Sequence, residues 1–326
     1  MNYPEAQYPG RLLKAESSQI EKGKGALGGI GAEIMVPRLK DIVALLEDLA
    51  PAELAESWDN PGLQVGFLDH RIEKMVLSLD PTLQAVSYAW DHRAQLLLTH
   101  HPLIFRPMSS VKGGDYPGGV VYEAIRCGVS IVAVHTNLDA AHEGINAILG
   151  DLLGLERIDV LNNRDQSGPY RSKARIEPRR ARTVQRTDLS KGNRTGIGRI
   201  GDLRAEKTLY ELVTMVKGLL RVSSVRVVGK KDMKIRRVAV VGGSGGSLIR
   251  EAYAKGADLL ITGDVSYHQA REAEFFGLAV IDGGHFATEK VAFAAFGKQL
   301  AKEMEQRNWK VEILHNDKEN DPIRAM

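Results

Sequence analysis

Apolar residues along the chain fall into short segments whose spacing changes from helical to strand-like, and this pattern begins near residue 35. In 35–50 the apolar side chains recur every three or four residues, which predicts an amphipathic helix. Later runs such as 75–80 and 96–99 are short and continuous, which is typical of strands buried on both faces. Strands of this kind that alternate with helices predict an α/β fold.

One strand–helix–strand pattern occurs twice. It is found in 75–101 (MVLSLDPTLQAVSYAWDHRAQLLLTHH) and in 238–264 (VAVVGGSGGSLIREAYAKGADLLITGD), at a constant offset of 163 residues. A further helix and strand follow each unit, at 120–135 and at 269–285. This repetition predicts two similar α/β lobes related by duplication, each with a mostly parallel sheet flanked by helices. We expect a metal site in the cleft between the lobes.

Composition divides the rest of the chain. Residues 1–34 show no sustained period and are rich in Gly, Ser, Lys and Glu, so we expect a flexible tail there. We assign 35–164 to the N-terminal lobe and 165–195 to a basic linker or loop. A connecting strand–helix–strand follows at 196–236, and the C-terminal lobe spans 237–326.

The charge of the chain is concentrated in one segment. The 326 residues carry a net charge of +3, yet the stretch 171–199 holds ten basic and two acidic residues, so it carries +8 and the remainder carries −5. Clustered arginine binds phosphate, but this stretch has no interleaved aromatic residues and no recognisable reader motif. We therefore expect a solvated flexible loop, or one that pairs with an acidic neighbour in an oligomer, in preference to a nucleic-acid-binding surface.

Two absences in the sequence indicate the compartment. The single cysteine, Cys127, excludes an internal disulfide and a cysteine-based zinc site. The sequence contains no run of about 18 apolar residues and no signal-peptide core, so it predicts no membrane span. The expected location is the cytoplasm.

Histidines mark the ends of the predicted strands, where open α/β sheets bind their ligands. Five of the nine histidines lie at or just beyond such ends: His100, His101, His135, His268 and His285. Two carboxylates accompany them, because Asp139 lies four residues after His135 and Glu289 lies four residues after His285.

The two lobes together offer five candidate metal ligands without cysteine, a donor set that suits zinc, manganese or iron. They are His100, His101, Asp139, His285 and Glu289. One catalytic zinc needs only three protein ligands, so five ligands with a bridging carboxylate predict two divalent ions about 3.5–4 Å apart. Helical spacing places His285 and Glu289 on one face. The adjacent pair His100 and His101 can point the same way only in a loop that leaves the strand.

Several of these features have a second interpretation. His268 alone is typical of a satisfied polar residue at a strand end, and His135 can be an orienting partner of Asp139 instead of a ligand. The glycine run 242–247 can cradle a phosphate at a helix start or can form a tight turn that needs glycine. The loop 106–119 can be a lid over the site or an ordinary surface loop.

Five segments resemble, in order, the signature segments of the NGG-interacting-factor-three-like family, whose members include GTP cyclohydrolase I type 2 homologues. They are ESWDNPGLQVG, LLLTHHPLIF, VAVHTNLDAAHEGIN, LLITGDVSYHQA and IDGGHFATEK, and the resemblance runs from about Met35 to Leu314. It implies two α/β lobes, a dinuclear metal centre and assembly into a hexameric toroid. It also implies the same five ligands, with Glu289 as the bridge and His135 near the metals.

These features predict a metal-dependent hydrolase that acts on a phosphorylated or purine nucleotide-like small molecule. The family resemblance implies hydrolytic ring opening of GTP. In this interpretation Glu289, His135 and His268 are the catalytic residues, with either histidine as the proton shuttle. The alternative is a metal-binding scaffold or regulatory protein without turnover, whose metal sites would be closed to water.

Overall fold

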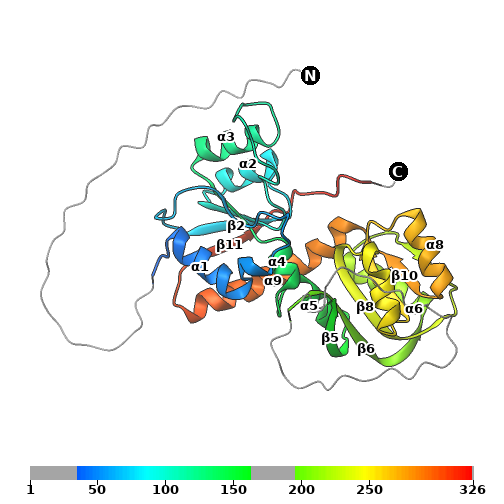
Figure 1. Cartoon of the computed structure of the whole chain (residues 1–326). Coiled ribbons are helices and arrows are strands. Elements are labelled where there is room, and N and C mark those ends of the chain that lie inside the picture. Colours follow the sequence, from blue (N-terminus) through cyan, green and yellow to red (C-terminus); the bar gives the residue numbers. More distant parts are fainter. Residues whose placement is uncertain (1–34, 163–194, 325–326) are drawn as a thin grey trace, which may run out of the picture. The chain divides into compact units, whose positions relative to one another are not determined.

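The computed structural model describes residues 35–162 and 195–324, and these residues form two β-sheets flanked by helices (Figure 1). The predicted tail 1–34 lies outside the described residues, as does nearly all of the predicted linker 165–195. The α/β class is therefore confirmed. No helix within the described ranges is both long and apolar enough to cross a membrane.

The first sheet is largely parallel. Its strand order is β1-β4-β3-β2-β11, and only the β1–β4 pairing is antiparallel. The strands are β1 (Gly62–Val65), β2 (Lys74–Ser78), β3 (Leu96–Thr99), β4 (Ser130–Ala133) and β11 (Glu312–His315). The associated helices are α1 (Leu39–Leu49), a 3-10 turn (Ala52–Leu54), α2 (Leu83–Asp91), α3 (Gly118–Cys127) and α4 (Thr136–Ala140).

The second sheet is mixed, which corrects the prediction of a mostly parallel sheet in this half. Its order is β5-β6-β8-β9-β10-β7, and only β8–β9 and β9–β10 are parallel pairings. The strands are β5 (Glu156–Asn162), β6 (Ile197–Thr208), β7 (Arg226–Val228), β8 (Lys234–Ser244), β9 (Leu259–Gly263) and β10 (Ala279–Asp282). The antiparallel pairings arise because the segment 196–236 contributes β6 and β7 to the sheet.

The helices of the second half and those that link the two sheets complete the described fold. They are α5 (Ile145–Leu152), α6 (Leu209–Leu220), a 3-10 turn (Gly246–Leu248), α7 (Ile249–Ala254), α8 (Tyr267–Phe276) and α9 (His285–Gln306). Local signals set several of these ends. Thr208 with Glu211 and Ser266 with Gln269 form capping boxes at the starts of α6 and α8. The helix α8 ends at Gly277, whose φ of +67° favours glycine.

The two sheets repeat one order of elements. In the first, β2, β3 and β4 are adjacent and β1 pairs with β4; in the second, β8, β9 and β10 are adjacent and β7 pairs with β10. Each half of the chain also contributes strands to the sheet of the other half. The C-terminal strand β11 pairs with β2 of the first sheet, whereas β5 and β6, which follow the first repeat, belong to the second sheet.

Equivalent faces of the two sheets contribute to one shared core. Met75 and Leu77 of β2 lie in this core together with Val238 and Val240 of β8, while the intervening Val76 and Ala239 face separate clusters. Figure 1 shows α2 and α3 on one side of the first sheet and α1 on the other. In the same way α7 and α8 cover one face of the second sheet, and α6 covers the other.

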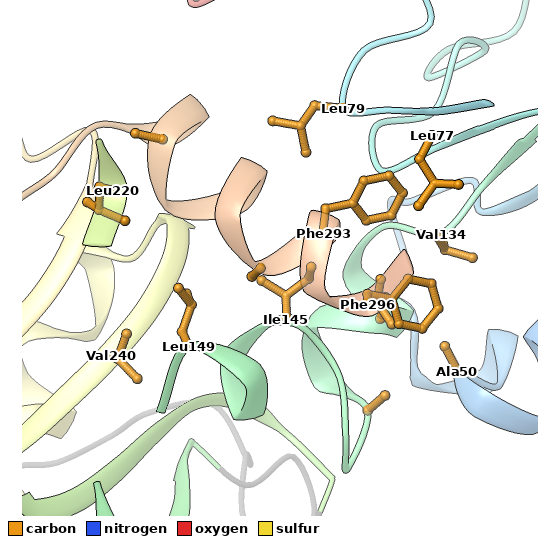
Figure 2. Close-up of a cluster of buried hydrophobic side chains, with 14 of the residues drawn as sticks. Ala50, Leu77, Leu79, Val134, Ile145, Leu149, Leu220, Val240, Phe293 and Phe296 are labelled. Carbon is orange, nitrogen blue, oxygen red and sulfur yellow. The ribbon is translucent and has the colours of Figure 1, made fainter. Parts of the chain in front are cut away.

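The long helix α9 contributes to the shared core of both halves and contacts strands of both sheets. It packs against α5, β8 and β9 and also contacts β11 of the first sheet. Figure 2 shows Phe293 and Phe296 of this helix beside Leu77 and Val134 of the first half. Because α9 carries two of the predicted site residues, its packing determines where they lie.

We predict that Phe296→Ala lowers the free energy of unfolding by about 3–5 kcal/mol, because truncation of a buried phenyl ring leaves a cavity. Phe296 is 1% exposed within the shared core. The matched control is Phe275→Ala on α8, whose ring is 74% exposed and whose loss should change stability by less than about 0.5 kcal/mol. Denaturant unfolding of both variants measures the difference, and equal effects would contradict the central role of α9.

Candidate metal centre

Two histidines leave the carboxyl end of β3 in a loop. The strand ends at Thr99, and His100 and His101 follow it outside regular structure. This is the loop that two adjacent histidines need if both side chains are to point the same way. His100 is completely buried, with its ring 5.8 Å from that of Phe293 on α9. His101 keeps 24% of its side chain exposed. One imidazole is therefore closed off from solvent and its neighbour is accessible.

The first turn of α9 presents His285 and Glu289 to these histidines. His285 Nε2 lies 3.1 Å from Glu289 Oε1, the one-turn contact that the helical spacing predicts. Glu289 Oε2 lies 3.1 Å from His101 Nε2, and Oε1 lies 3.6 Å from His100 Nε2. The single carboxylate of Glu289 thus approaches histidines from both halves of the chain.

The ligand atoms form two groups that share His101. In one group the ligand nitrogens of His100, His101 and His135 lie within 4.8 Å of one another. In the other group the same holds for nitrogens of His101 and His285 and a carboxylate oxygen of Glu289. Asp139 on α4 adjoins the first group, with its Oδ1 3.7 Å from His100 Nε2. Each group has the donor number and chemistry to hold a divalent metal ion.

One predicted site residue lies elsewhere. His268 is exposed in the first turn of α8, where its ring contacts that of Tyr267 at 5.5 Å, and it belongs to neither group. The structure therefore brings together the five predicted ligands and His135.

Each histidine of the two groups is oriented through its Nδ1 atom. The partners are Val134 O for His100 at 2.8 Å, Asp80 Oδ1 for His101 at 2.8 Å, Asp59 Oδ1 for His135 at 2.7 Å and Asp264 Oδ2 for His285 at 2.7 Å. A carbonyl or carboxylate oxygen can only accept, so Nδ1 donates and Nε2 is left for a metal. This is the orientation that metal-binding histidines adopt in proteins.

Three of these orienting groups were not identified from the sequence. Asp80 and Asp264 follow the carboxyl ends of β2 and β9, so the rule that selected the histidines applies to these carboxylates as well. Asp59 lies in the turn-rich segment before β1 and also accepts hydrogen bonds from Thr136. Its position beside His135 depends on tertiary folding, because 76 residues separate the two in the sequence.

The centre contains buried polar atoms that the protein itself does not satisfy. His100 Nε2, Asp139 Oδ1 and Glu289 Oε2 are buried and make no hydrogen bond within the described residues. In addition, His101 Nε2 and His285 Nε2 face each other at 3.4 Å, an arrangement that is favourable only with a proton or a cation between the lone pairs. These atoms fit a bound cation.

The histidines and carboxylates of the centre shift one another's pKa values. Burial opposes the charged form of His101, but the nearby carboxylates of Asp80 and Glu289 outweigh burial and raise its pKa to about 10. Glu289 raises the pKa of His285 to about 9 against burial, and Asp264 adds to this effect. The surrounding imidazoles lower the pKa of Glu289 well below its usual range despite its burial.

The pKa values of Asp139 and Asp59 shift in opposite directions. Burial raises the pKa of Asp139, against the opposing effect of His100. Burial would also raise the pKa of Asp59, but its hydrogen bonds with His135 and Thr136 dominate and lower it to about 2. Asp59 is therefore a charged anchor for His135 at neutral pH.

With this geometry established, comparison with known proteins is informative. Residues 37–322 match the Duf34/NIF3 (NGG1p interacting factor 3) family. The chain belongs to this family. It is 30% identical to the GTP cyclohydrolase 1 type 2 homolog of Clostridium acetobutylicum over 287 residues, which cover 88% of this chain and 98% of that protein. The homolog of Clostridium perfringens is 32% identical over 286 residues, with the same coverage of both chains.

Solved structures agree with this assignment. The Bacillus cereus protein related to NIF3 is 28% identical and superposes with a TM-score of 0.77, covering 90% of this chain and all (100%) of that one. Membership in the Duf34/NIF3 family and the NIF3-like fold are thus established, and the resemblance of the signature segments is confirmed.

The glycine run 242–247 forms the irregular end of β8 and the start of the 3-10 turn that follows, and it packs against the centre. The backbone N–H groups of Gly242, Gly243 and Gly245 donate to side-chain oxygens of Asn146, Thr288 and Thr262, so they are engaged within the protein. Gly243 has a φ of +62°, and a Cβ atom there would lie 2.1 Å from Glu289 Oε1. These contacts favour close packing that needs glycine over a phosphate cradle, although Gly242 and Gly243 lie at the end of β8 and not in a tight turn.

We predict that Gly243→Ala weakens metal retention by about tenfold or more, because the added methyl group displaces the Glu289 carboxylate. The matched control is Gly277→Ala, where φ is +67° but no atom lies within 4 Å of the added Cβ. Both variants bear similar backbone strain, so only the contact with Glu289 differs. Metal content after dialysis against a chelator measures the effect, and equal retention by the two variants would argue against it.

We predict that a rise in pH lowers the stability of the fold without metal but increases its affinity for metal. The raised pKa values of His101 and His285 stabilise the metal-free fold below about pH 6.5, and this contribution is lost as the pH rises through about 9–10. Metal needs the deprotonated Nε2 atoms, so metal affinity should increase over the same range. Titration calorimetry at pH 7 in two buffers of different ionisation enthalpy should detect released protons, and the absence of release would contradict the assignment.

Proposed function

We propose that this Duf34/NIF3 family protein is a hydrolase that depends on two divalent metal ions. The observation that carries the proposal is the position of Glu289, whose Oε1 lies 3.1 Å from His285 and 3.6 Å from His100 while Oε2 lies 3.1 Å from His101. A carboxylate between histidines of both groups is suited to bridge two ions. His100, His101, Asp139, His285 and Glu289 would hold them.

Two ions in such a centre supply an activated water and stabilise the charge that develops on the substrate. The protein contributes the orientation of the donors and the handling of protons. His135 is held by Asp59 at 2.7 Å, and 15% of its side chain is exposed, so it can exchange protons with the site and with solvent. We assign the proton shuttle to His135, because His268 lies outside both groups.

The accessibility of the centre supports catalysis over a scaffold role. His285 and His101 keep 35% and 24% of their side chains exposed, whereas His100 and Glu289 are buried. A purely structural metal site is closed by protein ligands, but a catalytic one leaves a position for water or substrate. The partial exposure on one side is consistent with such a position.

The proposed substrate class rests on the names of the relatives and not on the geometry of the centre. Both clostridial relatives are named GTP cyclohydrolase 1 type 2 homologs. We propose a phosphorylated or purine nucleotide-like substrate on this basis, since metal-activated hydroxide can attack an electron-poor purine carbon. The family resemblance also carries the proposal that copies of the chain assemble into a hexameric ring.

We predict that Glu289→Gln reduces hydrolysis of GTP, or of another nucleotide found in a substrate screen, by at least about tenfold to a hundredfold. The neutral amide cannot bridge two cations as a carboxylate can. The matched control is Glu305→Gln, an exposed residue of the same helix α9, which should keep full activity. Metal content is measured in parallel by mass spectrometry.

The outcomes separate the two functional hypotheses. Equal turnover by Glu289→Gln and wild type would contradict a catalytic centre at this position. Loss of metal from the variant, together with a wild-type protein that hydrolyses none of the screened phosphorylated metabolites, would favour the metal-binding scaffold.

A further inference from the structure

An exposed pair of aromatic side chains lies beside the candidate metal centre. The rings of Trp58 and Phe105 are 5.7 Å apart at an angle of 59°, and the residues are 55% and 46% exposed. Single exposed apolar side chains are common, but two large rings held together next to a polar centre indicate a binding surface. Neither residue has a role in the metal-binding scheme described above.

Hydrogen bonds join the two segments that carry the rings. Asn60 Nδ2 donates to Ile104 O at 2.6 Å, and Ile104 N donates to Gln64 Oε1 at 3.0 Å. These bonds tie the segment that ends in Phe105 to the turn that contains Trp58. The pair is thus formed by two segments that are 40 or more residues apart in the sequence and are joined next to the rings.

Trp58 links the pair to the candidate metal-binding groups. The Trp58 ring lies 6.0 Å from that of His135 in an edge-on arrangement, and the His135 ring lies 5.3 Å from His100 and 5.4 Å from His101. The residue after Trp58 is Asp59, which fixes His135 through Nδ1. The same turn therefore orients a histidine of the centre and places an indole beside it.

We propose that Trp58 and Phe105 form a stacking platform for a planar, purine-like ring of the substrate. The proposal rests on the hydrolase function proposed above and identifies how its substrate is recognised. Every nucleobase has a π-face, and stacking on an exposed aromatic side chain typically improves affinity by about tenfold or more. A substrate ring stacked on this platform would be separated from His101, which both groups share, only by the ring of His135.

The test measures binding to the metal-loaded full-length protein. The probes are guanosine 5′-monophosphate and ribose 5-phosphate, which share the phosphorylated sugar and differ in the purine ring. The variants are Trp58→Ala, Phe105→Ala and the conservative Trp58→Phe. The control is Trp90→Ala on α2, because Trp90 is 49% exposed and comparable in size and accessibility to Trp58.

We expect Trp58→Ala to weaken binding of guanosine 5′-monophosphate by about tenfold, and Phe105→Ala to weaken it by less. Trp58→Phe should retain most of the affinity, and Trp90→Ala all of it. Ribose 5-phosphate should bind equally to every variant. Metal content should stay unchanged throughout, which shows that the centre itself is intact.

Three binding results would overturn the platform. They are absence of guanosine 5′-monophosphate binding by the wild type, equal affinity of wild type and Trp58→Ala, and an equal loss of ribose 5-phosphate binding in that variant. A lower assembly mass of Trp58→Ala by light scattering would instead assign the pair to a contact between copies, and would also overturn it. Because binding is measured without turnover, a platform that binds but supports no hydrolysis would refute only the proposed function.

Discussion

The packing of α9 between equivalent faces of the two sheets is the constraint on which the site depends. Phe293 and Phe296 belong to the core shared by both sheets, and the same helix begins with His285 and Glu289. The apolar contacts of α9 therefore position a carboxylate that must reach histidines after β3. The stability of the core and the geometry of the centre are properties of one helix, because a shift of α9 would move both.

Electrostatics explains why the buried position of the Glu289 carboxylate is energetically unfavourable without a bound cation. Glu289 is 4% exposed and lies among three imidazoles, and its Oε2 makes no hydrogen bond within the described residues. A buried carboxylate without a countercharge is unfavourable, and the raised pKa values of His101 and His285 correspond to protonated imidazoles that partly supply that countercharge. Divalent ions would replace those protons, so the arrangement links protonation to metal binding.

The turn before β1 contacts both the candidate metal centre and the exposed aromatic pair beside it. Asp59 holds His135 while its neighbour Trp58 contacts the same ring and packs against Phe105. A short segment thus acts on both the centre and the surface beside it.

The sequence by itself determined the α/β class, the repeated strand–helix–strand units and the positions of histidines at strand ends, because these depend on local periodicity. It also determined the one-turn spacing of His285 and Glu289. Only the tertiary structure decided that β11 returns to the first sheet, that the second sheet is mixed, and that His268 is separate while Asp59, Asp80 and Asp264 orient the histidines. Strand pairing and side-chain convergence depend on contacts between distant residues, which a local pattern does not encode.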